Sequence, residues 1–297
     1  NLFGLNELYI KTIAPTQYRT LVNGYKWPRA VGLVGNPNVM GFLMTLFSIY
    51  ILFLILKDYK KWYYYIIYSF VVICVFLTAS RTSYISLIMG NFVLLFLSIL
   101  KIKKIKFTKI VLICLVFLSF HGLLVLTLPN SYTWRIKEII NYKNATSWQK
   151  RVDNNKEFIY ELENIDKKND VDVNEDNKKD FDNIDIEGNV SSKKYTLLIG
   201  NGPDKMMEYH KNYFDNEWFM FIFRYGIIGL MAYLFMVCVP LVYFKKDKDF
   251  NYCIYISLLV ANFIYMIAAG SFHSYVLFGI TIIFMVLSLK YNKIRTS

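Results

Sequence analysis

Three arginines, Arg29, Arg81 and Arg151, stand in polar segments of a chain that is otherwise strongly apolar. A guanidinium is permanently charged, and its planar fork of donors fits the oxygens of a phosphate or a carboxylate. Arg81 has apolar sequence on both sides, and an unpaired cation in that setting is costly. For Arg81 this setting indicates an internal, watered cavity or an anionic partner. The alternative is a solvated surface charge or, for Arg81, snorkelling to lipid phosphate.

A second polar group lies in the segment GNGPDKMMEYHKNYFDNEW, which then continues as an apolar helix. His210, Asp215 and Asn216 supply an imidazole, a carboxylate and an amide, which are groups that can take a proton from a hydroxyl or orient it. Gly200 and Gly202 frame a turn that we expect to need positive φ or close backbone approach. No GK[ST] follows, so the turn is not a phosphate loop.

Two further candidates, Asn36 and Asn38, end the segment YKWPRAVGLVGNPN, residues 25–38. Its prolines and glycines predict a structured loop rather than a helix. Asn36 and Asn38 are expected to cap the following helix and to point amides outward. The alternative is a capped loop in which Arg29 is simply exposed.

The elements that position these residues are predicted to be membrane-spanning helices. Hydrophobic residues make up 55% of the 297 residues, which is typical of a polytopic membrane protein. Helix is expected because in lipid it alone satisfies every backbone group within one segment. The stretches long enough to span are Val39–Leu56, Tyr63–Ala79, Ser83–Leu100, Phe107–Leu128, Ile227–Phe244, Tyr252–Ala269 and Ser274–Leu289. We therefore expect an all-α protein with about seven transmembrane helices.

The distribution of charge predicts which ends of these helices face the cytoplasm. The segments Lys57–Trp62, Lys101–Lys109, Lys245–Phe250 and Lys290–Ser297 hold fourteen Lys or Arg and three Asp, which is +11 of the net +12. The alternate short turns hold only Arg81. This is the positive-inside pattern, so the basicity indicates membrane orientation and not nucleic-acid binding. All the candidate site residues then fall on the outer face.

This topology divides the chain into four parts. Residues 1–38 form an extracytoplasmic segment, 39–128 hold transmembrane helices 1–4, 129–216 form a large extracytoplasmic loop, and 217–297 hold a juxtamembrane helix and transmembrane helices 5–7. Within the loop we expect two short outer helices in Asn130–Tyr160 and a disordered Asn/Asp/Lys-rich insertion at about 161–194. The juxtamembrane helix is predicted because Arg224 lies about two turns past Asp215.

The four cysteines all fall within predicted spans, at spacings that suit neither a disulfide framework nor a metal site. They are interpreted as small apolar fillers, and no metal or other cofactor is expected. The chain opens at Asn1 without a methionine, which suggests further helices ahead of it.

Taken in order, the motifs resemble the O-antigen ligase and polymerase family, the Wzy-like integral membrane glycosyltransferases. The motifs are R-x-x-G-x-x-x-N-P-N at Arg29–Asn38, SRTS at Ser80–Ser83, S-x-x-x-R at Ser147–Arg151, GNGP at Gly200–Pro203 and DN-x9-G-x-x-G at Asp215–Gly229. Each is weak alone, but five in order on one predicted membrane face are fairly specific.

The resemblance implies a GT-C-like, metal-independent glycosyltransferase of the cytoplasmic membrane, acting on its outer face. Its donor would be an oligosaccharide on undecaprenyl diphosphate. Arg29, Arg81 and Arg151 would bind the diphosphate, Asn36, Asn38, Gly200 and Gly202 would shape the site, and a flippase and a chain-length regulator would be partners. Ligases carry His-Asn where this chain has Asp215-Asn216. Either Asp215 takes the role of that histidine, or His210 folds back into the site.

The departure at Asp215 favours a polymerase, which transfers the growing chain to a lipid-linked repeat unit. A ligase or a protein O-oligosaccharyltransferase is the alternative within the family. A transporter or a scaffold of polysaccharide export is the alternative from another class. A transport path would need a chain of buried polar groups along the spans, and in the sequence His121 and Asn262 are the main ones.

Overall fold

The fold is known from a computed structural model. It describes residues 12, 29–30, 36–58, 60–101, 107–128, 133, 139, 153, 156, 198–200, 217–243, 250–267, 279 and 281–286. The chain divides into two compact units, Asn1–Asn141 with Val237–Ser297, and Tyr142–Met236. All the secondary structure in the described residues is helical, which confirms the all-α class. The insertion predicted at 161–194, and nearly all of the two helices predicted in 130–160, lie outside the described residues.

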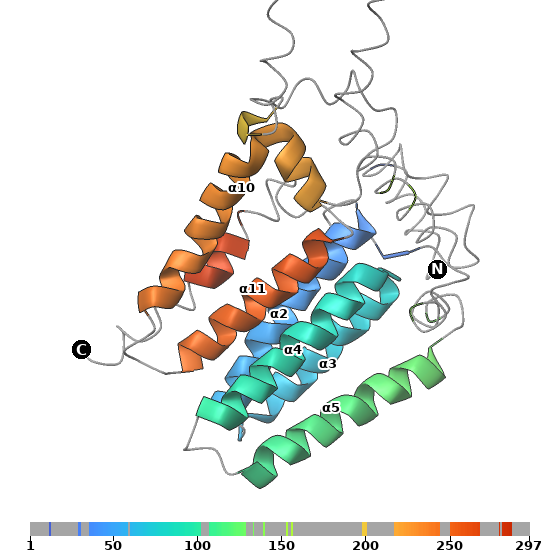
Figure 1. The fold of residues 1–297 in the computed structure, drawn as a ribbon. Helices are drawn as coiled ribbons and strands as arrows, with labels where there is room; N and C mark the ends of the chain where they lie inside the picture. Colours follow the sequence, from blue (N-terminus) through green and yellow to red (C-terminus); the bar gives the residue numbers. More distant parts are fainter. Residues whose placement is uncertain are drawn as a thin grey trace, which may run out of the picture. The chain divides into compact units, whose positions relative to one another are not determined.

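The first unit is built around four helices that pack side by side (Figure 1). They are α2 (Pro37–Lys57), α3 (Trp62–Leu77), α4 (Arg81–Lys101) and α11 (Phe250–Met266). α2 packs against each of the other three, and α4 also packs against α11. The fully buried core side chains include Phe42, Leu46, Ile49, Val72, Phe76, Leu87, Leu94 and Leu258. Because only a few residues join α2 to α3 and α3 to α4, consecutive helices run antiparallel.

A glycine lets three of these helices approach closely. A Cβ built on Gly90 of α4 would lie 2.5 Å from Ile49 Cδ1 of α2 and 3.1 Å from the Cβ of Ala261 on α11. Without a hydrophobic driving force between helices in lipid, close packing of small residues is what holds a membrane bundle together.

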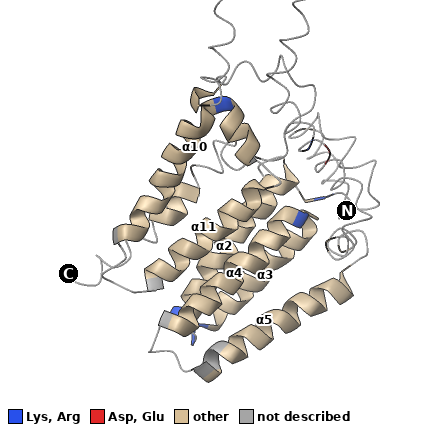
Figure 2. Ribbon diagram, in the orientation of Figure 1, with Lys and Arg blue, Asp and Glu red and all other residues tan. Residues whose placement is uncertain are grey.

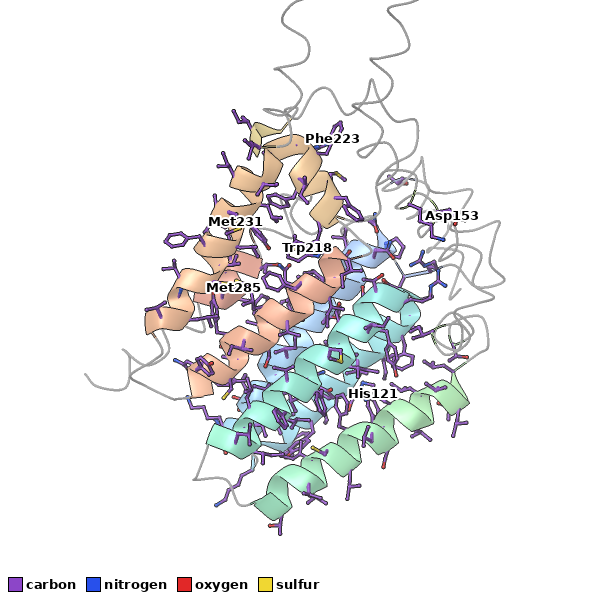
Figure 3. All side chains as sticks on the ribbon, viewed as in Figure 1. His121, Asp153, Trp218, Phe223, Met231 and Met285 are labelled. Carbon is purple, nitrogen blue, oxygen red and sulfur yellow. The ribbon has the colours of Figure 1, made fainter. Side chains whose placement is uncertain are left out.

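The helix α5 (Phe107–Thr127) packs along one face only. Phe117, His121 and Leu124 are buried, whereas Leu112, Leu118 and other large apolar residues between and around them are exposed. Figure 3 shows His121 on the side of α5 that is turned toward α4. An apolar helix with a largely exposed apolar surface is stable in a lipid environment but not in water.

The helix α10 (Glu217–Tyr243) consists of two arms joined at Gly226, whose φ of 67° and ψ of −175° are not helical (Figure 1). The break falls between the juxtamembrane helix and the span that the sequence predicts to begin at Ile227. The first arm, which ends at Tyr225, carries Arg224 one residue from its end.

Among the described residues, three helices are long and apolar enough to cross a membrane: Pro37–Lys57, Arg81–Leu100 and Trp218–Val242. Trp62–Leu77, Val111–Thr127 and Asn251–Met266 are apolar but shorter. Five of these six coincide with stretches expected from the sequence. Trp218–Val242 overlaps the predicted span Ile227–Phe244 but also includes the first arm of α10 and the break at Gly226. Of the seventh expected stretch, only residues 279 and 281–286 are described. In Figure 2 the basic residues of the four-helix bundle lie at helix ends.

Candidate functional site

One end of the four-helix bundle gathers four of the predicted site residues. We name it the arginine end: α2 and α4 begin there, and α3 and α11 finish there. The sequence analysis predicts that it faces outward. Phe42, in the second turn of α2, stacks on Tyr265 of α11 with ring centroids 4.1 Å apart, which joins the first and last of these helices.

Asn36 caps α2, as expected. Its Oδ1 accepts hydrogen bonds from the backbone N–H of Asn38 at 2.8 Å and of Val39 at 3.3 Å, which satisfies two of the helix's unpaired donors. Asn38 is not a cap, which corrects the expectation for this residue. It lies inside the first turn of α2, and its side-chain oxygen accepts a hydrogen bond of 3.0 Å from Nη2 of Arg29.

Arg29 is buried, with 9% of its surface exposed, and it lies against the C-terminus of α3. Its Nε donates to the carbonyl oxygen of Thr78 at 2.7 Å, and the next residue, Ala30, donates its N–H to the carbonyl of Leu77 at 2.9 Å. The last carbonyls of a helix lack partners within the helix and carry partial negative charge. A cation that donates to them is therefore favourably placed, so Arg29 is not the exposed loop arginine of the alternative interpretation.

The turn between α3 and α4 is held by hydroxyl groups. Ser80 Oγ and Ser83 Oγ are 2.8 Å apart, Ser83 Oγ also donates to the carbonyl of Asn38 at 3.2 Å, and Thr45 Oγ1 of α2 donates to the carbonyl of Ser83 at 3.0 Å. This short turn contains Ala79 at φ 48°, in the left-handed region. Arg81 lies between the two serines and is the first residue of α4, so it is inside the helix and not in the turn.

The packing of α2 against this turn requires a glycine. A Cβ on Gly41 would lie 2.7 Å from Ser83 Oγ, 2.8 Å from Thr78 Oγ1 and 2.9 Å from Ser83 Cβ, all shorter than van der Waals contact. The first turns of α2 and α4 consequently lie in direct contact.

At the arginine end, the charges of Arg29 and Arg81 are close enough to act on each other. Burial, and to a smaller extent the charge of Arg81, lower the pKa of Arg29 to about 10, and Tyr265 opposes this shift. No carboxylate of the described residues is among the groups that act on Arg29. The N-termini of α2 and α4, which carry partial positive charge, add to the field of the two guanidinium groups. An anion is therefore favoured at this end of the bundle.

The second unit contains Gly200, the other site residue that the structure describes. Gly200 has φ of 88°, which confirms the expected positive φ, and a Cβ there would overlap the carbonyl of Arg224. Reciprocally, a Cβ on Gly226 would overlap the carbonyl of Leu198. The chain at residues 198–200 thus lies directly against the break in α10 at Gly226, which we call the α10 elbow. Only glycines permit the two backbones to approach so closely.

The structure therefore brings Arg29, Asn36, Asn38 and Arg81 to one end of the bundle and places Gly200 against the α10 elbow. Arg151, Gly202, His210, Asp215 and Asn216 lie outside the described residues. No group of His, Cys, Asp or Glu that could hold a metal ion occurs in the described part of the chain.

A buried polar group that was not expected from the sequence lies in the middle of the bundle. Asn91 of α4 is fully buried, and its Nδ2 donates to Ser48 Oγ of α2 at 3.0 Å and to the Tyr68 hydroxyl of α3 at 3.2 Å. The view that His121 and Asn262 are the main buried polar residues of the spans was wrong. An asparagine inside an apolar run is the signal that should have identified it.

No protein-family model, curated protein or solved structure matches this chain. The class of protein rests on the molecule itself: it is an all-helical protein with helices apolar enough to cross a membrane. The resemblance to the ligase and polymerase family rests on the motifs alone.

Proposed function

We propose that this protein is a membrane glycosyltransferase that polymerises a cell-surface polysaccharide on the outer face of the cytoplasmic membrane. Its donor would be an oligosaccharide linked to undecaprenyl diphosphate, and its acceptor a lipid-linked repeat unit. The observation that carries the proposal is the arginine end. Segments far apart in the sequence place Arg29 near Arg81 there, and no carboxylate of the described residues acts on Arg29. The N-termini of α2 and α4 also lie at this end, and each carries partial positive charge.

This arrangement suits the departure of a diphosphate. An acceptor hydroxyl attacks the anomeric carbon of the donor, the new C–O bond forms, and the bond from that carbon to the diphosphate oxygen breaks. The bonding electrons pass to the diphosphate, where negative charge develops. Arg81, half-buried at the start of α4, is the residue that we expect to contact these oxygens.

The proton of the acceptor hydroxyl needs a base. Asp215 is the candidate from the sequence, with Asn216 orienting the hydroxyl and His210 as the alternative base. An arginine is permanently charged, so it supplies fixed positive charge for the diphosphate leaving group.

The proposal is tested with purified protein in lipid nanodiscs and a lipid-diphosphate-linked repeat unit as the sole substrate. We expect a ladder of longer products, and a loss of about 100- to 1,000-fold in kcat/KM for Arg81→Ala, since one preorganised donor to a developing oxyanion contributes that much. Lys61→Ala, at the opposite end of α3 and exposed beside Asp58, is the control and should retain activity. Absence of any product from the parent protein, or full activity of Arg81→Ala, would overturn the proposal.

A further inference from the structure

The guanidinium of Arg29 is bound by the protein itself. Arg29 is buried, and two of its nitrogens are engaged by the protein: Nε by the carbonyl of Thr78 at 2.7 Å and Nη2 by the side-chain oxygen of Asn38 at 3.0 Å. These bonds use two of the five N–H donors of the guanidinium, and the burial of the side chain restricts the access of a ligand to the other three. Arg81 is less buried and stands at the first position of a helix.

Both bonds of Arg29 lead to the short chain segment that carries Arg81. Thr78 precedes Arg81 by three residues, so the bond to its carbonyl holds the segment from the α3 side. Asn38 reaches the same segment from the α4 side, because its backbone carbonyl accepts the hydroxyl of Ser83 at 3.2 Å. Arg29, Asn38 and Ser83 thus form one connected set of hydrogen bonds around Arg81.

The charge of Arg29 fits this role as well. It lies at the carbonyl end of α3, where a cation is stabilised, and its bonds to Thr78 and Asn38 replace the water lost on burial. A lysine would keep the charge, but it has no planar fork with which to reach both acceptors in the same geometry. The structure therefore needs an arginine here for reasons that involve no ligand.

We propose that Arg29 is a positioning residue: it fixes the turn that presents Arg81 and does not itself bind the diphosphate. This differs from the sequence-based expectation, which places Arg29 among the diphosphate ligands. The kinetic part of the inference rests on the proposed function, whereas the conformational part does not.

The conformational test measures how fast a thiol at Thr82→Cys reacts with a membrane-impermeant maleimide. Thr82 is partly exposed and follows Arg81, so its reactivity reports on the turn. Arg29→Lys and Asn38→Ala should each raise the rate at least about threefold, because each removes a bond that suppresses local opening. Asn38→Asp keeps an acceptor for Arg29 and should leave the rate near that of the parent.

A thiol at Thr127→Cys, on the exposed end of α5, is the matched control, and its rate should not change in any of these variants. Unchanged reactivity at Thr82→Cys in both Arg29→Lys and Asn38→Ala would overturn the inference, whether or not the protein makes polymer. Asn38→Ala keeps the test decisive if Arg29→Lys does not accumulate in the membrane.

The kinetic test compares kcat with KM for the lipid-linked donor. A positioning role predicts that Arg29→Lys and Asn38→Ala each lower kcat about tenfold with little change in KM. The double variant should have a kcat no lower than that of the less active single variant, because both substitutions break the same connection. A rise in KM in Arg29→Lys alone, with normal kinetics in Asn38→Ala, would identify Arg29 as a diphosphate ligand and refute the inference.

Discussion

Replacing Gly41 by alanine should disturb the arginine end more than the addition of one methyl group would suggest. The new Cβ would lie 2.7 Å from Ser83 Oγ and 2.9 Å from Ser83 Cβ. The hydroxyl cannot simply rotate away, because it is hydrogen-bonded to Ser80 and to the carbonyl of Asn38. The Cβ of Ser83 can move only with the backbone of α4. The strain must therefore separate α2 from the first turn of α4, which carries Arg81.

The magnitude follows from two opposing effects. Overpacking a close contact destabilises a protein by about 1–3 kcal/mol. Alanine in place of glycine in a helix stabilises it by about 1 kcal/mol. Gly122→Ala isolates the second effect, because Gly122 is also helical and a Cβ there would have no neighbour within 4 Å. Gly41→Ala should accordingly be about 1–3 kcal/mol less stable than Gly122→Ala.

The assay is reversible unfolding in mixed micelles of increasing denaturing detergent, followed by tryptophan fluorescence. A second measurement combines Ser83→Gly with Gly41→Ala. Ser83→Gly removes two of the three atoms closest to the new Cβ, so the double variant should recover part of the stability lost in Gly41→Ala, and the two effects should not be additive. The reasoning is refuted if Gly41→Ala and Gly122→Ala unfold at the same detergent fraction.

Three other predictions follow from the same structure. Asn91→Ala should lower stability by about 1–3 kcal/mol in the same unfolding assay, because two buried hydroxyls lose a partner; a parent-like midpoint would show that the bonds contribute nothing. Gly226→Ala should be more destabilising than Gly122→Ala, since it combines positive φ with overlap of a backbone carbonyl; equal stability would contradict the elbow. In intact cells an impermeant maleimide should label Thr82→Cys but not Lys60→Cys, and the reverse pattern would overturn the predicted orientation.

The class of protein and the positions of its helices could be predicted from the sequence. The six apolar stretches that the structure describes correspond to helices, because long apolar runs leave the backbone no alternative to helix in lipid. The sequence also indicated a change near the start of α10, because Arg224 predicts that the membrane span begins after this residue. Gly226 supplies the backbone conformation that ends the first arm. Such features depend on local composition, which the sequence displays directly.

Hydrogen-bond partners could not be predicted in this way. Asn36 and Asn38 are both asparagines at the start of α2, yet one caps the helix and the other binds Arg29. The two arginines at this end likewise read alike as cations, although one is buried against the carbonyls of α3. The sequence likewise gives no indication that Asn91 bonds to side chains of α2 and α3.

The sequence by itself determined that this chain forms apolar helices and that Arg29 and Arg81 fall near their ends. Only the tertiary structure decided that Arg29 reaches Thr78, forty-nine residues away. The physical reason is that hydrophobicity is a property of each segment, whereas the partner of a buried polar group is whatever the folded chain places within about 3 Å of it.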